Sequence, residues 1–226
     1  PPRSTLFPYT TLFRSTSNNS MGRAISVNDL LMKKYKLFEF DGEWYEAFDN
    51  PERTGIWFVW GNSGNGKTTF VLALVKYLAR FGRVAYNSLE EGSSHTIRKS
   101  FANVGMEEVG RQVVLIDGES IDELEERMGK RRSADVWVID SIQYAGLTYE
   151  RYKKLKERNR SKLIILVSHA DGKMPEGRSS KKIMYDSTMK IWIEGYRALS
   201  KGRYIGPNGG TYTIWEEGAD KYWGGN

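Results

Sequence analysis

Apolar and polar positions along the chain follow two alternating patterns, which predict a regular succession of strands and helices. Short apolar runs, each of the length of a buried strand, occupy residues 55–60, 83–89, 112–117, 135–140 and 162–169. Between these runs, apolar residues recur at helical spacing in residues 67–81, 93–105, 120–132 and 148–160. Apolar strands that alternate with helices predict an α/β fold, with a mostly parallel central sheet and helices on both of its faces.

The two ends of the chain depart from this alternation. Strand-like runs follow one another at residues 189–196, 202–206 and 211–217, which predicts antiparallel strands at the C-terminal end of the sheet. The polar, glycine-containing residues 170–182 predict a flexible loop. In the N-terminal part we expect a short helix and then an acidic, aromatic segment that packs beside the main domain, at residues 27–36 and 42–52.

Residues 1–20 differ in character from the rest of the chain. They repeat the tripeptide TLF, contain two arginines and no acidic residue, and show no period that continues into the following sequence. They resemble translated sequencing-adapter contamination, and a targeting peptide is the alternative. We therefore expect a non-native or disordered leader at 1–20, an N-terminal segment at 21–53 and the main domain at 54–226.

Composition narrows the class of protein without identifying it. A chain of 226 residues is long enough for one α/β domain with its own core. The lack of cysteine excludes disulfides and thiolate metal sites, and it suits a cytoplasmic location. No apolar run approaches the length of a membrane span, so no membrane contact is expected. The formal net charge of +6 slightly favours a polyanionic partner.

The segment GNSGNGKTT at residues 61–69 carries the strongest chemical signal. It fits the pattern G-x-x-x-x-G-K-[ST] and lies between a predicted strand and a predicted helix, as a phosphate-binding loop requires. Glycines let backbone N–H groups converge on an anion, and the helix N-terminus adds its free donors. The lysine reaches the outer phosphates and the threonine hydroxyl binds Mg²⁺. The sequence predicts an ATP–Mg²⁺ site formed by Gly61, Asn62, Ser63, Gly64, Asn65, Gly66, Lys67, Thr68 and Thr69.

A second element of a phosphate site lies further along the chain. The segment VWVIDSIQY at 136–144 places Asp140 at the end of an apolar strand, where a carboxylate can hold Mg²⁺ through water. Apolar strands that end in Asp are common, so this interpretation depends on the loop at 61–69. Together the two elements predict Thr68 and Asp140 as the metal-binding residues.

With these motifs, the chain resembles the RecA/RadA/DnaB superfamily of P-loop ATPases. The resemblance covers about residues 54–217 and is carried by the loop, by IDSIQ at 139–143 and by SLEE at 88–91. It implies a RecA-like core that hydrolyses ATP. In this superfamily the strand after the first helix ends in a glutamate that polarises the attacking water; Glu90 matches this position, and Glu91 is the alternative one residue later.

The resemblance implies roles for three further groups. His169 matches a polar residue that senses the γ-phosphate, and Lys201 and Arg203 match a Lys-x-Arg pair that reaches the γ-phosphate of a neighbouring subunit. The second match implies a homo-oligomer, either a ring or a filament. A loop that contacts single-stranded DNA is implied by the cations Lys173, Arg178, Lys181 and Lys182. The alternative for His169 is a solvent-facing histidine or one satisfied within the core, and for the cations it is ordinary solvated side chains.

Within the superfamily, the segments IDSIQY, SHADGK and IWEEGADKYW are most similar to those of small RecA-like ATPases of phages and prophages. That similarity implies ATP hydrolysis coupled to single-stranded DNA, in phage-type recombination, repair or annealing. One alternative is a motor like a replicative helicase, or a helicase loader. The other is a KaiC-like regulatory ATPase that acts on proteins. No residue of an adenine pocket is predicted.

Overall fold

The computed structural model describes residues 24–224, so the expected leader at 1–20 lies outside the described residues. The chain divides into two compact units, one ending at Tyr35 and the other beginning at Lys36. The first unit contains α1 (Val27–Met32), which Ser26 caps by accepting the backbone N–H of Asp29. None of the side chains of α1 is buried. The helix stops at Met32, earlier than expected, because Lys33 is already in an extended conformation.

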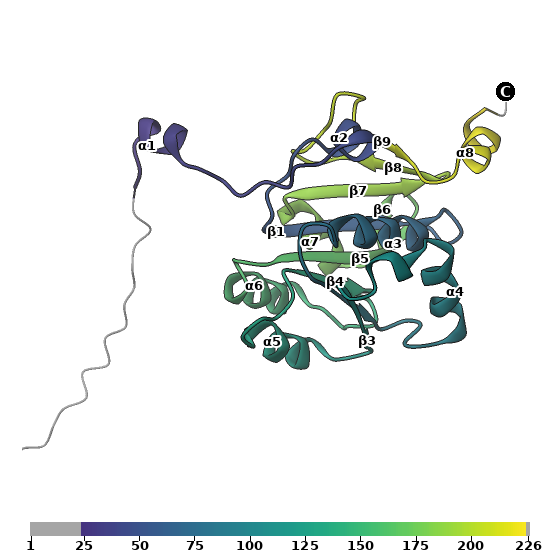
Figure 1. Ribbon diagram of the computed structural model, residues 1–226, viewed down its shortest axis with the longest axis horizontal. Coiled ribbons are helices and arrows are strands. Elements are labelled where there is room, and N and C mark those ends of the chain that lie inside the picture. The colour runs from purple at the N-terminus through teal and green to yellow at the C-terminus, as the bar shows by residue number, and fades with distance from the viewer. Residues whose placement is uncertain (1–23, 225–226) are drawn as a thin grey trace, which may run out of the picture. The chain divides into compact units, whose positions relative to one another are not determined.

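The second unit is built on one large sheet, with strand order β3–β2–β4–β5–β1–β7–β8–β9 (Figure 1). Strands β3, β2, β4, β5, β1 and β7 are parallel, whereas β8 pairs antiparallel with β7 and β9 pairs antiparallel with β8. This confirms the predicted α/β fold, its mostly parallel sheet and its antiparallel end. The strands are β1 (Gly55–Gly61), β2 (Val84–Ser88), β3 (Val113–Asp117), β4 (Val136–Asp140), β5 (Leu163–Asp171), β6 (Met174–Pro175), β7 (Met189–Glu194), β8 (Arg197–Ser200) and β9 (Thr211–Thr213).

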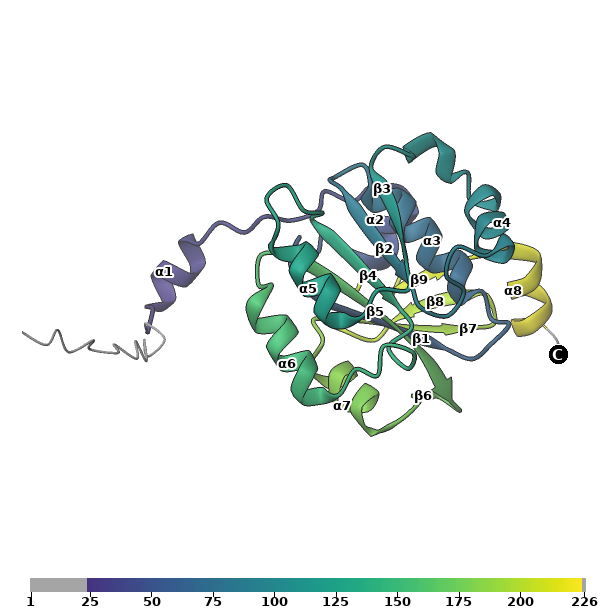
Figure 2. The same cartoon turned by 90° about the horizontal axis from the view of Figure 1, so that it is seen from below.

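Helices cover both faces of this sheet, as the alternating pattern predicts (Figure 2). On one face pack α2 (Gly42–Phe48), α3 (Lys67–Leu78), α4 (His95–Asn103) and the short 3₁₀ helix η1 (Met106–Val109). The other face is covered by α5 (Ile121–Gly129), α6 (Tyr149–Arg158) and α7 (Arg178–Asp186). Within β1, Trp57 and Val59 belong to the first layer, and Phe58 and Trp60 to the second. Burial on both faces explains why the strands read as continuous apolar runs.

The segment 36–53 packs on the sheet as part of the second unit. Phe38 and Phe40 lie against Trp57, with ring centroids 5.9 and 6.4 Å apart respectively. In α2, Trp44 stacks on Tyr212 of β9 at 4.4 Å. The expected packing of the acidic, aromatic segment beside the main domain is therefore present.

The C-terminal part differs from the prediction in two places. The strand expected at 202–206 is wrong: β8 ends at Ser200 and a loop follows, where a side chain at Gly206 would collide with the backbone of Glu46. The strand expected at 211–217 is shorter, because β9 ends at Thr213 and α8 (Glu216–Trp223) follows. Two acidic residues in the first turn of α8 favour a helix start there.

Strand β3 forms an end of the sheet and pairs with β2 alone among the described strands. Val114 and Leu115 of this strand are 53% and 38% exposed. Beside it lies a hollow whose lining includes Lys130, Arg131 and Arg132. Among residues 24–224, no helix has both the length and the apolar character needed to cross a bilayer.

Candidate functional site

The predicted phosphate loop joins β1 to α3 at the carboxyl edge of the sheet. Gly64 and Gly66 have φ values of 77° and 90°, a conformation that residues with a side chain rarely adopt. A side chain at Gly61 would lie 2.6 Å from the carbonyl oxygen of Ile193 in the neighbouring strand. Asn65 accepts the backbone N–H of Gly195 at 2.8 Å, which ties the loop to the turn after β7. The sequence pattern thus reflects the space and the backbone geometry of this turn.

A cavity of about 440 Å³ opens over this loop and brings together residues from the ends of β1, β2 and β4, with Tyr196 after β7. Lys67 and Thr68 come from the start of α3, Glu90 follows β2, and Asp140 ends β4. These predicted residues, distant in sequence, therefore share one cavity. Its lining residues are Asn62, Ser63, Gly64, Gly66, Lys67, Thr68, Thr69, Ser88, Glu90, Glu91, Asp140 and Tyr196.

Asp140 is a half-buried carboxylate whose side chain has one direct partner among the described residues. The phenol of Tyr86 on β2 donates a hydrogen bond to it. Burial raises the pKa of the Asp140 carboxyl above its ordinary value, while the hydrogen bond from Tyr86 and the charge of Lys67 act in the opposite direction. The same burial, with the adjacent carboxylate, raises the pKa of Tyr86. A carboxylate that is partly removed from water in this way is poorly compensated until a cation approaches it.

The residues present fit a magnesium ion. The hydroxyl of Thr68 and the carboxylate of Asp140 line the same cavity and are hard oxygen donors of the kind that Mg²⁺ prefers. Within the described residues, no group of three or more His, Cys, Asp or Glu side chains forms a metal cluster. A cation held by few protein oxygens together with nucleotide phosphates needs no such cluster.

Replacing Asp140 by Asn is expected to stabilise the nucleotide-free protein. Because the pKa of Asp140 is raised in the folded state, ionisation of this carboxyl at neutral pH lowers the free energy of unfolding. The neutral amide of Asn removes this destabilisation, and its oxygen can still accept the hydrogen bond from Tyr86. We expect Tm at pH 7 to rise by about 2–4 °C, the effect of ~1 kcal/mol in a chain of this size. The gain should shrink as the pH falls through the raised pKa, and a lower Tm at pH 7 would contradict the assignment.

Glu90 and Glu91 have different surroundings. The Oε2 atom of Glu90 lies 2.9 Å from Nε2 of His169. Glu91 instead accepts the hydroxyl of Thr96 at the start of α4. Glu90 also lines a second cavity, of about 350 Å³, next to the first. This second cavity is lined by Ser63, Lys67, Glu90, His169, Ala170, Asp171 and Glu176.

The loop expected at 170–182 is ordered secondary structure. Strand β5 continues to Asp171, turns at Gly172 and pairs with β6, and α7 begins at Arg178. The indole N–H of Trp60 donates to the carbonyl of Lys173 at 3.1 Å, and the side-chain amide of Asn62 donates to the carbonyl of Gly172 at 3.0 Å. These bonds attach the hairpin to β1 and the phosphate loop. The four predicted DNA-binding cations thus lie on the turn (Lys173) and on α7 (Arg178, Lys181 and Lys182).

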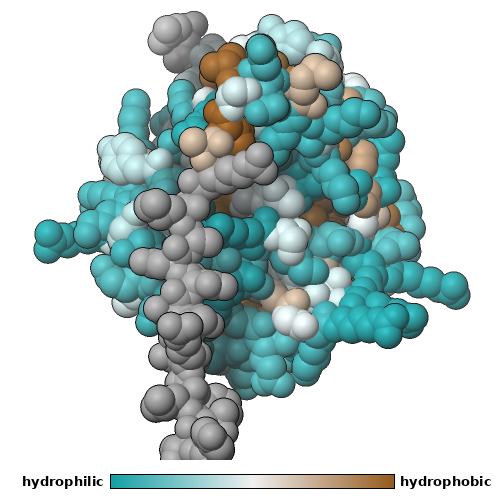
Figure 3. All heavy atoms as spheres, turned by 90° about the vertical axis from the view of Figure 1, so that its left-hand side faces the viewer, coloured by the Kyte–Doolittle hydropathy of each residue, from teal (hydrophilic) through white to brown (hydrophobic). Residues whose placement is uncertain are grey.

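Lys201 and Arg203 lie far from the cavity of their own chain. Because β8 runs antiparallel, it ends at the amino edge of the parallel strands, and the backbone N–H of Lys201 donates to the carbonyl of Lys190 at the start of β7. That side of the molecule is dominated by hydrophilic residues (Figure 3). In this position neither cation lines the cavity of its own chain.

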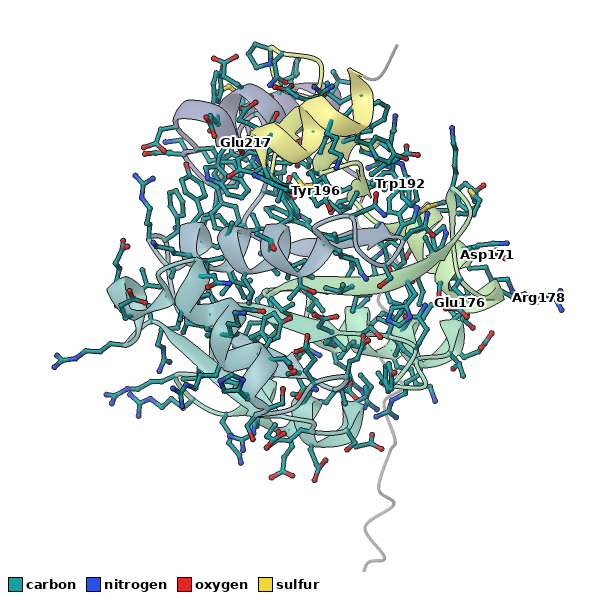
Figure 4. The ribbon with its side chains drawn as sticks, turned by 90° about the vertical axis from the view of Figure 1, so that its right-hand side faces the viewer. Asp171, Glu176, Arg178, Trp192, Tyr196 and Glu217 are labelled. Atoms are coloured by element: carbon teal, nitrogen blue, oxygen red, sulfur yellow. The ribbon has the colours of Figure 1, made fainter. Side chains whose placement is uncertain are left out.

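Tyr196 is a site residue that the sequence analysis missed. It follows β7 with φ 59°, and its ring lies 3.3 Å from the place that a side chain at Gly66 would take. Trp215 packs edge-on against this ring, with centroids 4.9 Å apart. Figure 4 shows Tyr196 beneath α8, on the same face of the molecule as Glu176 and Arg178. Its contact with the phosphate loop joins residues 130 positions apart (196 − 66), which no local pattern reveals.

Comparison of the sequence with protein-family models gives no match, and neither does comparison with curated proteins. Many solved structures are similar to the chain, including the following two. A KaiC-like protein from the hyperthermophilic archaeon Pyrococcus horikoshii has a TM-score of 0.54 and 22% identity, over 80% of this chain and 97% of that one. The flagellar accessory protein FlaH from Methanocaldococcus jannaschii has a TM-score of 0.56 and 16% identity, over 80% and 92%.

The chain has a RecA-like fold. In a RecA-like fold, as in other open parallel sheets, ligands bind beyond the carboxyl ends of the strands. The cavity over residues 61–69 lies at that edge. The expected RecA-like fold is thereby confirmed, while the resemblance to the RecA/RadA/DnaB superfamily and the narrower likeness to phage recombination ATPases stay predictions.

Proposed function

We propose that this protein binds ATP with Mg²⁺ and hydrolyses it. The observation that carries the proposal is the cavity in which Lys67, Thr68, Glu90 and Asp140 meet over a glycine-rich turn. A cation, a hydroxyl and two carboxylates around a helix N-terminus match the needs of phosphoryl transfer to water. Such catalysis depends on positioning and on stabilisation of charge, and the protein supplies both at this edge of the sheet.

Each group has a defined task in this proposal. The loop N–H groups and Lys67 bind the β- and γ-phosphates, and Thr68 and Asp140 hold Mg²⁺, which neutralises charge on the phosphate oxygens when bound. Glu90 accepts the proton of the attacking water. Its position beside Lys67, in both cavities, supports this role over one for Glu91.

Tyr196 offers an aromatic surface for the nucleobase at the side of the cavity. We expect Tyr196→Ala to raise the KM for ATP by about 10-fold with little change in kcat, because base stacking is worth roughly 1–3 kcal/mol and is equal in ground and transition states. Steady-state kinetics measure both constants. Tyr222→Ala, a change at an exposed tyrosine of α8, is the control; a fall in kcat without a change in KM in Tyr196→Ala would place the base elsewhere.

We further propose that the protein acts as a homo-oligomer in which Arg203 and Lys201 reach the site of a neighbour. Arg203→Ala is expected to lower kcat by about 10³-fold while ATP binding persists, because an arginine that acts in trans usually contributes a factor of this size to kcat. Mixing it with Glu90→Gln protein should restore part of the turnover, because a mixed interface can combine an intact glutamate with an intact arginine. Absence of recovery at every mixing ratio would contradict a shared site.

The proposed macromolecular partner is single-stranded DNA, in phage-type recombination, repair or annealing. Arg178 and Lys182 are exposed on α7, and Tyr185 of the same helix is 68% exposed. The ammonium of Lys182 lies 5.5 Å from the ring centroid of Tyr149 on α6. In complexes with single-stranded nucleic acid, cations bind the phosphates and exposed aromatic rings stack on the bases. This arrangement on an ordered surface supports the DNA proposal, in place of the flexible loop that was expected.

A second candidate function is a KaiC-like ATPase that acts on proteins, favoured by the likeness to the KaiC-like structure. The test measures ATP hydrolysis by the full chain with and without single-stranded DNA, at about 50 and about 200 mM salt. The DNA proposal expects stimulation that declines with salt and is lost in Arg178→Ala/Lys182→Ala, but kept in the control Lys130→Ala/Arg131→Ala. A rate of ATP hydrolysis that does not change on addition of DNA would favour the protein-directed ATPase. Unwinding of a duplex would favour the helicase-like alternative.

A further inference from the structure

His169 lies between two carboxylates from different elements. Its Nε2 atom is 2.9 Å from Glu90, which follows β2, and its Nδ1 atom is 3.8 Å from Oε2 of Glu176, which follows β6. The first contact has the length of a hydrogen bond, and the second that of a charge contact. Figure 4 shows Glu176 with Asp171 and Arg178, on the hairpin and helix at the carboxyl edge of the sheet.

The backbone around His169 is fixed from two sides. Its N–H donates to Oε1 of Gln143 at 3.3 Å, and its carbonyl accepts the N–H of Glu176 at 3.0 Å. The side-chain amide of Gln143 also donates to the hydroxyl of Ser168 at 2.8 Å. With the backbone held, the main freedom left to His169 is rotation of its ring.

The two carboxylates select one orientation of this ring. With Nε2 directed at Glu90 and Nδ1 at Glu176, the imidazolium form of the ring, which carries a proton on each nitrogen, directs one N–H at each carboxylate. A ring turned by half a rotation would place carbon atoms against both carboxylates. Glu90 is 41% exposed along its side chain and has no other hydrogen bond among the described residues, so the ring is also what restrains Glu90.

We propose that Glu176 is a positioning residue for hydrolysis: it orients the His169 ring, and the ring in turn holds Glu90 at the boundary of the two cavities. This inference rests on the proposed ATP hydrolysis at the same site. Glu176 does not line the phosphate cavity and therefore contributes to turnover without contributing to nucleotide binding. Asp171, on the other strand of the hairpin, lines the second cavity but forms no ion pair with His169 in the described part of the chain.

The kinetic test compares Glu176→Gln with the matched control Asp171→Asn. Glu176→Gln is expected to lower kcat by roughly 10-fold with an unchanged KM for ATP, since small displacements of a catalytic group are costly. Asp171→Asn should leave kcat within about two-fold of wild type. In a His169→Gln background, Glu176→Gln should have no further effect, because the two residues act in series. An equal loss in Asp171→Asn, a rise in KM alone, or a full effect without His169 would overturn the proposal.

A spectroscopic test separates this inference from the proposed function. The chain has two histidines, so ¹⁵N-labelled histidine gives two sets of ring signals, with His95 as an internal control. Glu176→Gln should move the ring signals of His169 and leave those of His95 in place, whether or not the protein turns over ATP. Unchanged His169 signals would overturn the positioning role. An inactive wild-type protein in which His169 responds as expected would refute ATP hydrolysis and leave the ring orientation established.

Discussion

ATP turnover is expected to fall by about 10³-fold or more when Lys67 is replaced by Ala. Lys67 is the first residue of α3 and lines both cavities, so its ammonium is the cation next to the position of the γ-phosphate. Charge grows on the transferred phosphoryl oxygens in the transition state, and Ala leaves this charge unopposed on that side. Phosphate release under saturating ATP gives kcat, and titration with a fluorescent ATP analogue gives the affinity.

Lys76→Ala is the matched control for Lys67→Ala. Lys76 lies on the same helix, but its ammonium bonds the carbonyl of Val104 and the carboxylate of Glu108, away from the phosphate cavity. Its loss should change turnover by less than about two-fold. Turnover near the wild-type level in Lys67→Ala, with the fold intact by circular dichroism, would refute the assignment of the loop.

Glu90→Gln is expected to bind ATP but to hydrolyse it about 10³-fold more slowly. The amide keeps the size of the carboxylate and can still bond His169, but it cannot accept a proton from water. The expected outcome is therefore a protein that retains unhydrolysed ATP. Single-turnover experiments with radiolabelled ATP distinguish this state from failure to bind.

Glu91→Gln tests whether Glu90 or Glu91 is the catalytic glutamate. Glu91 accepts the hydroxyl of Thr96, so its replacement should act mainly on the start of α4 and lower turnover only slightly. If Glu91→Gln retains ATP and Glu90→Gln turns over normally, the catalytic glutamate is one residue later than proposed.

The sequence predicts well those features that show up as a pattern among neighbouring residues. The phosphate loop is recognisable because Gly64, Gly66 and Lys67 act through their own backbone conformation and the helix that follows. The central strands are recognisable because helices cover both faces, so almost every position in β1 is apolar. Both features can be recognised from residues that are close together in the sequence.

Helix α7 and the hairpin before it could not be predicted in the same way. Only Ser180, Ile183 and Met184 of α7 are buried, so its sequence reads as a polar loop. The hairpin is fixed by Trp60 and Asn62, more than a hundred residues earlier. The roles of Tyr196 and Glu176 likewise arise from contacts between distant elements, which appear only once the sheet is assembled.

The open edge at β3 has a consequence for how concentrated solutions of this protein behave. Exposed Val114 and Leu115 on an end strand invite pairing between copies, a common route to aggregation. Lys130, Arg131 and Arg132 stand beside that edge, so two copies that approach through it bring like charges together. This repulsion is screened by salt. The protein should therefore aggregate less at low ionic strength than at high ionic strength. Added salt during purification weakens the electrostatic repulsion that keeps these edges apart.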